Sequence, residues 1–195
     1  MEQRLESLQF VAAQSLGSKR LEKLAQSVAK NFKPTSVSSL EKANDLAFRL
    51  YVINRKDLAM LVCKELDQIK FDNNYNVWTW VESALALEAR MLKEERQDKQ
   101  AEECVKKIRA PFEAGDETLK SIKSKALNRR LNGDLLPFDK IIESQQDNDS
   151  PLEMDYRFAA LKELIYISEL GGSEELTVKS INQQIQDNLS RIKIT

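Results

Sequence analysis

Residues 71–90 read FDNNYNVWTWVESALALEAR and hold both tryptophans of the chain, Trp78 and Trp80. Positions two apart on an α-helix differ by about 200°, so the two indole rings point in nearly opposite directions. Apolar residues continue along both directions, and a helix with two apolar sides has to be covered by neighbours on both of them. The stretch therefore predicts an inner helix of a stacked helical array. The strip left for solvent is predicted to carry Thr79, Glu82, Ser83, Arg90 and Lys93.

Glu88 falls in the middle of the apolar arc of the same helix. A carboxylate in such a place is costly unless it is paired. One hypothesis is a catalytic or ligand-gripping acid. The other is an internal salt bridge to Arg49 or Arg55, or a position at the edge of the packing. A single acid without a second group in register is not a mechanism, so the structural explanation is favoured.

Composition favours helices throughout the chain of 195 residues. Only 5 glycines and 4 prolines are present, which is too few turn formers for an all-β fold. Apolar residues recur at helical spacing, and no convincing alternating pattern occurs. Ser38, Asp57 and Asn76 are predicted N-caps, and Pro111 is a predicted stop. The predicted helices cover about 2–16, 19–32, 38–53, 57–69, 76–93, 100–109, 117–131, 137–142, 151–170 and 173–192.

These helices predict one all-α domain of about eight to ten helices, stacked as antiparallel hairpins. Residues 1–110 are predicted to form the regular part of the domain. An irregular charged connector follows at 111–151, and a C-terminal helix pair at 152–195.

Residues 40–110 resemble the tetratricopeptide repeat in their spacing. The matching positions are Leu46-Ala47, Leu50, Asn54 and Ala59 in one hairpin and Trp80, Ala84, Leu87 and Ala101 in the next. The two hairpins begin about 37 residues apart, near the family's period of about 34. The resemblance implies a longer turn at 93–97 in the second hairpin and equivalent places for Cys63 and Cys104. The glycines and the terminal proline of the family pattern are missing.

The chain contains no histidine and 2 cysteines, Cys63 and Cys104. Histidine-based catalysis and histidine-containing zinc sites are thereby excluded, and two thiolates cannot complete a four-thiolate site. The formal charge of −1 attracts neither nucleic acid nor an anionic membrane. No apolar run approaches the roughly 18 residues that span a bilayer. We expect a cytoplasmic protein with reduced thiols and without a metal or another cofactor.

Two groups of residues are candidates for contact with a partner protein. Tyr51 lies off the main apolar stripe of its helix, and Tyr75 lies in a loop beside the tryptophans, where it could instead fold onto the helix. The basic stretch 120–130 contributes Lys120, Lys123, Arg129 and Arg130. Without interleaved aromatic residues this stretch is not typical of RNA binding. Its alternatives are a solvated surface or pairing with the acidic segment 139–155.

The function predicted from these features is a non-enzymatic protein-binding module, acting as a monomer or a homodimer. A narrower version, by fold-level analogy, is a small bacterial immunity or antitoxin-type protein that binds and neutralises a partner protein. A scaffold or adaptor is the alternative of the same class. A carboxylate enzyme is the alternative of another class, with Glu88 and either Glu82 or Asp45 as acid and base. Convergent acids in a pocket would favour the enzyme.

Overall fold

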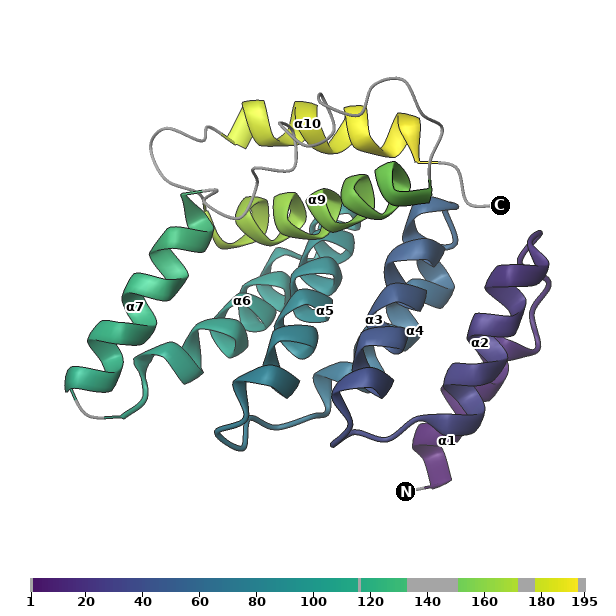
Figure 1. Cartoon of the computed structure of the whole chain (residues 1–195), viewed down its shortest axis with the longest axis horizontal. Coiled ribbons are helices and arrows are strands. Elements are labelled where there is room, and N and C mark those ends of the chain that lie inside the picture. Colours follow the sequence, from purple (N-terminus) through teal and green to yellow (C-terminus); the bar gives the residue numbers. More distant parts are fainter. Residues whose placement is uncertain (1, 116, 133–150, 172–177, 193–195) are drawn as a thin grey trace. The chain divides into compact units, whose positions relative to one another are not determined.

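The computed structural model describes residues 2–115, 117–132, 151–171 and 178–192, and all regular structure within these ranges is helical (Figure 1). The prediction of an all-α fold is confirmed for this part of the chain. The predicted helix at 137–142 and most of the acidic segment 139–155 lie outside the described residues. The helices are α1 Glu2–Ala12, α2 Lys19–Asn31, α3 Val37–Val52, α4 Lys56–Asp67, α5 Tyr75–Glu94, α6 Asp98–Glu113, α7 Glu117–Leu131, α9 Pro151–Leu170 and α10 Val178–Arg191.

The chain divides into two compact units within α6. The first unit runs to Cys104 and contains α1 to α5 with the beginning of α6. The second begins at Val105 and contains the rest of α6, α7, α9 and α10. The helix α7 lies in the first half of the predicted connector at 111–151, and its bounds agree with the helix predicted at 117–131.

In the first unit, consecutive helices pack in antiparallel pairs from α1 to α5, and α1 also contacts α4 while α3 contacts α5 (Figure 1). The helix α5 is buried along all of 81–89. Trp78 is buried and Trp80 is half-buried at the beginning of this helix. The solvent strip predicted for α5 is partly wrong, because Glu82 and Ser83 are buried. Thr79 and Lys93 are exposed, as that strip requires.

The turns that join α3 to α4 and α5 to α6 have the same geometry. Asn54 and Arg96 both adopt a left-handed backbone conformation, each with φ of 61°. In each turn the following amide donates to a leucine carbonyl at 2.8 Å, Arg55 to Leu50 and Gln97 to Leu92. This is the Schellman arrangement, which satisfies carbonyls at the end of a helix.

The equal turns correct the repeat register predicted from the sequence. The second turn is not longer than the first, and the extra residues lie in α5, which has 20 residues against 16 in α3. Leu50 and Leu92 are 42 positions apart and are equivalent, because each accepts the same hydrogen bond in its own turn. Ala59 and Ala101 keep the same separation, and both are fully buried. In this register Cys104 is equivalent to Val62, and the predicted equivalence with Cys63 is wrong.

Several predicted helix ends are also wrong. The N-cap of α3 is Ser36, whose hydroxyl accepts from the amide of Ser39 at 3.4 Å. The N-cap of α5 is Asn74, whose side chain accepts from the amides of Asn76 and Val77. In both helices the observed N-cap has the same residue type as the predicted one and lies two positions earlier. The predicted and the observed residues are all of types that commonly cap helices.

Two further helix ends also differ from the prediction. Asp57 does not cap α4; it pairs with Arg55 through two hydrogen bonds of 3.1 Å, which lower the pKa of its carboxyl. Pro111 does not end α6, which continues to Glu113 with Pro111 inside it. Proline in a helix removes one donor, and here the helix ends less than one turn later.

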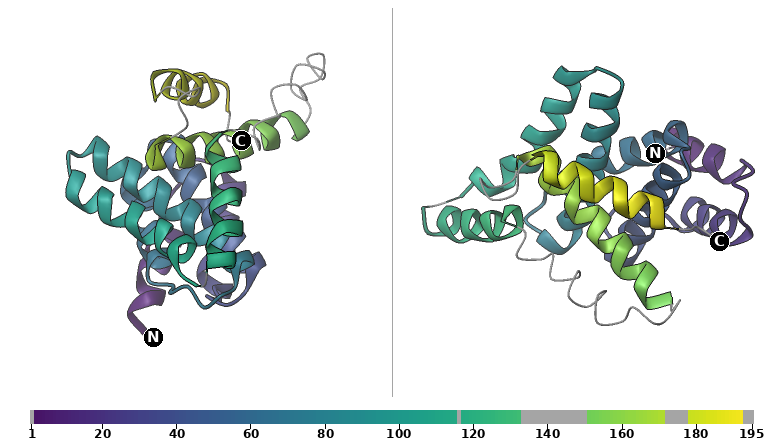
Figure 2. Two further views of the ribbon diagram at one scale, coloured as in Figure 1. Left: turned by 90° about the vertical axis from the view of Figure 1, so that its left-hand side faces the viewer. Right: turned by 90° about the horizontal axis from the view of Figure 1, so that it is seen from above.

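In the second unit, α9 and α10 form a hairpin, and α7 also packs on α9 (Figure 2). The observed bounds of α9 match the predicted helix 151–170, and Gly171 follows with φ of 80°, the left-handed conformation expected after a helix end. Tyr166 is completely buried on α9. Ile181 and Ile185 of α10 are buried, and so is Ile192, which directly follows this helix.

Candidate functional site

Glu88 is buried in the first unit, with 5% of its surface exposed, and Glu82 and Glu65 are buried as well. Glu82 and Glu88 are six positions apart on α5, which separates them by about 9 Å along the axis and by about 240° around it. They therefore leave the helix in different directions. Among the described residues, no group of three or more His, Cys, Asp or Glu side chains is placed to hold a metal ion. The carboxylate enzyme stays a prediction, and the geometry of α5 does not bring Glu82 and Glu88 together as an acid and base pair.

Asn44 is a buried polar residue that sequence reasoning missed. It is fully buried on α3, and its amide nitrogen donates to the carbonyl of Trp80 at 3.2 Å. The bond joins the middle of α3 to the first turns of α5. Its position among the apolar residues of α3 was the available signal, since a buried amide requires a hydrogen-bond partner.

Cys63 of α4 and Cys104 of α6 are both buried. Burial raises the pKa of the Cys63 thiol well above its usual value, and the charges of Glu88 and Cys104 add to the effect. The three side chains are therefore close enough to interact electrically. A reactive cysteine needs a lowered pKa and access to solvent, so Cys63 is placed as a packing residue and not as a nucleophile.

Tyr51 forms the centre of a polar network between α3, α4 and α5. Its hydroxyl donates to Glu94 Oε1 at 2.9 Å and accepts from Arg90 Nε at 2.9 Å. Lys56 Nζ donates to the other oxygen of Glu94 at 2.7 Å. Burial is the largest cause that raises the pKa of Tyr51 to about 12. With 5% of its surface exposed, Tyr51 offers a partner little area, and its predicted contact role stays a prediction.

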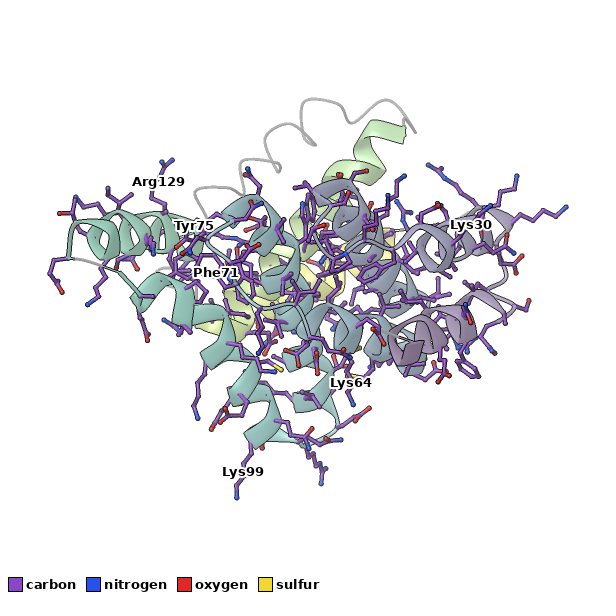
Figure 3. All side chains as sticks on the ribbon, turned by 90° about the horizontal axis from the view of Figure 1, so that it is seen from below. Lys30, Lys64, Phe71, Tyr75, Lys99 and Arg129 are labelled. Carbon is purple, nitrogen blue, oxygen red and sulfur yellow. The ribbon has the colours of Figure 1, made fainter. Side chains whose placement is uncertain are left out.

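Tyr75 belongs to a small aromatic cluster where the chain enters α5. Its ring lies edge-on to Phe71 at 4.9 Å between centroids, and Phe71 is edge-on to Trp78 at 5.5 Å. Figure 3 shows Phe71 and Tyr75 side by side at this turn. The indole Nε1 of Trp78 is buried and has no hydrogen-bond acceptor among the described residues. Tyr75 is half-buried in this cluster, so the folded alternative describes its ring better than a protruding loop tip.

Lys123 and Arg130, two of the basic candidates of α7, contact other segments of the second unit. Lys123 Nζ donates to the carbonyls of Pro111 and Ala114, at 3.1 and 2.9 Å, at the end of α6. Arg130 forms a two-pronged ion pair with Glu163 on α9 and lies over the ring of Tyr166. The partner of Arg130 is thus a residue of α9 that the sequence analysis did not consider. Whether the acidic segment 139–155 also pairs with α7 stays a prediction.

The other side of α7 faces solvent, and we call its residues Ile122, Lys125 and Arg129 the outer face of α7. Ile122 is 60% exposed, and Lys125 and Arg129 are exposed. In Figure 3 the side chain of Arg129 projects away from α7. Lys120 lies about 160° around the helix from Ile122, outside this face, and pairs with Glu117 at 3.1 Å. Sequence reasoning missed Ile122, although it lies off the stripe formed by Leu127 and Leu131.

A polar depression of about 240 Å³ lies between the end of α2 and the beginning of α3. The hydroxyl of Ser39 accepts from the amide of Lys33 at 2.8 Å, and the hydroxyl of Ser36 caps α3. These hydroxyls already serve the turn between the helices. The lining residues are Ser27, Val28, Asn31, Lys33, Ser36, Ser38, Ser39 and Lys42.

No helix within the described ranges is long and apolar enough to cross a bilayer. No curated protein and no solved structure matches the chain. Residues 2–194 match one protein family, and its description assigns no function from which a site residue or a partner could be transferred. Since the match covers nearly the whole chain, the protein belongs to this family of unknown function, DUF6707.

Proposed function

We propose that the chain is a non-enzymatic protein-binding module whose contact surface includes the outer face of α7. The observation that carries the proposal is Ile122, which is 60% exposed and is followed on the same side of α7 by Lys125 and Arg129, about one and two turns later. Burial of an exposed aliphatic side chain against a partner favours binding, and neighbouring cations orient the partner.

The inner side of α7 supports the same proposal. Leu127 and Leu131 are buried, and Arg130 and Lys123 are engaged with α9 and with the end of α6. These contacts pack α7 against α9 and the end of α6, so the outer face belongs to a packed helix and not to a loop. Contacts on rigid elements cost less conformational entropy on binding than contacts on loops.

The tetratricopeptide-like architecture is part of the proposal for α3 to α6. Its support is the repeated Schellman turn and the pair of fully buried alanines, Ala59 and Ala101, in the second helix of each hairpin. The departure is the separation of 42 positions between equivalent residues, against about 34 in the family. Helical hairpin arrays commonly present surfaces for other proteins.

Two modes of binding are consistent with this proposal. In the first, the chain neutralises one partner protein, as an immunity or antitoxin-type protein does. In the second, it acts as a scaffold that leaves its partner active. An assay of the captured partner's own activity, with and without the chain, separates the two modes.

Site-specific photocrosslinking tests the proposal. Ile122 is replaced by p-benzoylphenylalanine in cells that naturally produce the chain, and Lys99, an exposed residue of α6, is replaced in the control. The expected result is a protein adduct from position 122 that is absent from position 99. A chain that gives no protein adduct at position 122 above the control would contradict the proposal.

A further inference from the structure

We infer that the polar depression between the end of α2 and the beginning of α3 binds the phosphate group of a small molecule. The inference goes beyond the proposed function, because the depression belongs to the first unit and uses no residue of α7. It follows from the chemistry of the wall, from the wall groups that the fold leaves unengaged, and from the volume of the depression.

The wall of the depression carries positive charge and hydrogen-bond donors. Lys33 and Lys42 supply ammonium groups, and four serines together with Asn31 supply hydroxyl and amide groups. Val28 is the apolar residue among them, and none of the described residues that line the depression is an acid. A cation would be repelled by such a wall, whereas an anion can pair with the lysines and accept hydrogen bonds from the hydroxyls.

Part of the wall already serves the fold. The hydroxyl of Ser39 accepts from the amide of Lys33 at 2.8 Å and donates to the carbonyl of Asn31 at 3.5 Å. The amide side chain of Asn31 donates to the carbonyl of Ser27 at 3.0 Å, and Ser36 caps α3. These bonds hold the backbone of the turn, so a ligand has less ordering left to impose.

Other groups of the wall have no partner within the part of the chain that the structure describes. The ammonium groups of Lys33 and Lys42 form no ion pair there, and the hydroxyls of Ser27 and Ser38 form no hydrogen bond there. A lysine binds phosphate as a point charge, and a hydroxyl can donate to a phosphate oxygen. Two cations and two hydroxyls are therefore available to an anion.

The sequence around the depression has the same sign of charge. From Lys23 to Lys42 the chain carries four lysines and one acid, Glu41, which is not among the residues of the wall. Lys23 and Lys30 are both exposed on α2. Since like charges on one surface attract anions beyond the contact distance, these lysines favour the approach of the same ligand.

Phosphate matches the wall better than a carboxylate does. A phosphate monoester carries a charge of about −1.5 to −2 at neutral pH and three oxygens that accept strong hydrogen bonds. This charge corresponds to two lysines, and the oxygens can be shared between the ammonium groups and the hydroxyls. A carboxylate offers a single charge and two oxygens, so it would leave part of the wall unused.

The volume of the depression favours a small ligand. It is about 240 Å³, below the roughly 300 to 1,000 Å³ of sites for drug-sized molecules, so it accommodates one compact group. An RNA strand would also require aromatic residues for base stacking, and none is among the described residues of the wall. Peptide recognition requires further pockets for neighbouring side chains, which makes a phosphoprotein the less favoured source of the phosphate.

Titration of the full chain, followed by NMR of the backbone amides, tests the inference. The probes are inorganic phosphate and glycerol 3-phosphate, added at constant ionic strength. We expect saturable shifts of amides within 27–42, with a Kd of about 1 mM or tighter for at least one probe. Comparison of the two probes separates free phosphate from a phosphate monoester. Acetate is the control ligand and should give no saturable shift.

Matched variants connect the shifts to the wall. K33Q/K42Q removes both cations and should weaken binding at least about tenfold, and S38A should weaken it about threefold. The control K64Q/K99Q removes two exposed lysines elsewhere in the first unit. It should keep the Kd within about twofold of the unmodified chain. The replaced side chains are exposed, and circular dichroism melting verifies that each variant is folded.

Four results would overturn the inference. They are the absence of a saturable shift within 27–42 with both phosphate probes, equal affinity of K33Q/K42Q and the unmodified chain, acetate binding as tight as phosphate binding, and equal weakening by K64Q/K99Q. A phosphoserine peptide that binds at least about tenfold tighter than glycerol 3-phosphate would assign the depression to a phosphoprotein and would also overturn the small-molecule ligand. Crosslinking at position 122 tests the proposed function independently of all these results.

Discussion

Arg130 on α7 and Glu163 on α9 form a two-pronged ion pair, in which Nε donates to Oε2 at 2.7 Å and Nη2 donates to Oε1 at 2.6 Å. The side chains are 12% and 18% exposed, and the guanidinium carbon lies 3.5 Å from the centre of the Tyr166 ring. The pair therefore connects α7 to α9 through three interacting groups, in a place where water screens the charges weakly.

Removal of Arg130 should destabilise the protein strongly. Arg130→Ala leaves the carboxylate of Glu163 without this partner, and the expected loss is about 2 to 4 kcal/mol. Arg129→Ala, on the outer face of α7, is the control and should cost less than about 1 kcal/mol. Urea unfolding of R130A, E163A and the double variant should give a coupling energy of about 1 to 3 kcal/mol. Two losses that simply add would show that the pair does not contribute as a unit.

The stability of the first unit should depend on Tyr51 at high pH. The folded pKa of about 12 lies above the unfolded value of about 10, because burial disfavours the phenolate. The folded state thus keeps a proton that the unfolded state loses. The stabilisation is fully present below about pH 10 and is lost as the pH rises toward about 12.

Tyr51→Phe should remove this dependence and should cost about 1 to 2 kcal/mol at neutral pH, since two hydrogen bonds to charged groups are lost. Urea unfolding at a series of pH values up to about 11 measures both effects. Tyr75→Phe is the control for a phenol outside the network. An unchanged slope in Y51F would assign the loss of stability at high pH to other groups.

The two left-handed turn residues should respond differently to substitution. Arg96 holds φ of 61° with a long side chain, whereas Asn54 adopts the same φ as a residue type that tolerates it. Arg96→Gly should therefore stabilise the protein by about 0.5 to 1 kcal/mol. Asn54→Ala should destabilise it by about 1 kcal/mol. Chemical unfolding of both variants checks the pair, and a destabilised R96G would show that the arginine side chain has a role of its own.

The thiols of Cys63 and Cys104 should react only after unfolding. Both are buried, and the pKa of Cys63 is well above its usual value. A disulfide reagent at neutral pH should modify the native protein at least about 1000-fold more slowly than the urea-unfolded chain. Cys104→Ala isolates the reaction of Cys63. Rapid labelling of the native C104A variant would mean that the core around Cys63 opens locally.

Local chemistry was sufficient to predict the helices. The spacing of apolar residues and the scarcity of glycine and proline predicted the all-α fold, and the bounds of α7 and α9 agree with the structure to the residue. The predicted caps failed where two suitable residues compete within one segment, as Ser36 and Ser38 do. Which of the two residues becomes the N-cap depends on where the preceding helix ends in space.

The candidate contact residues were predicted by type, and their roles depended on tertiary contacts. Arg129 and Arg130 are neighbours of the same chemistry, yet Arg129 is exposed and Arg130 is half-buried beside Glu163, 33 positions away. Glu82 was expected in solvent and is buried, because the covering of α5 extends past its apolar arc. The register of the hairpins likewise followed from the turns at Asn54 and Arg96 and not from the spacing of small residues.

The order of residues alone decided that this chain forms amphipathic helices, because helical periodicity and backbone breakers act over a few neighbouring positions. The fold in space decided which charged side chains are buried in pairs and which remain on the outer face of α7. Burial and pairing depend on groups brought together from distant parts of the chain, and the free energy of a charge depends on those groups more than on its neighbours in sequence.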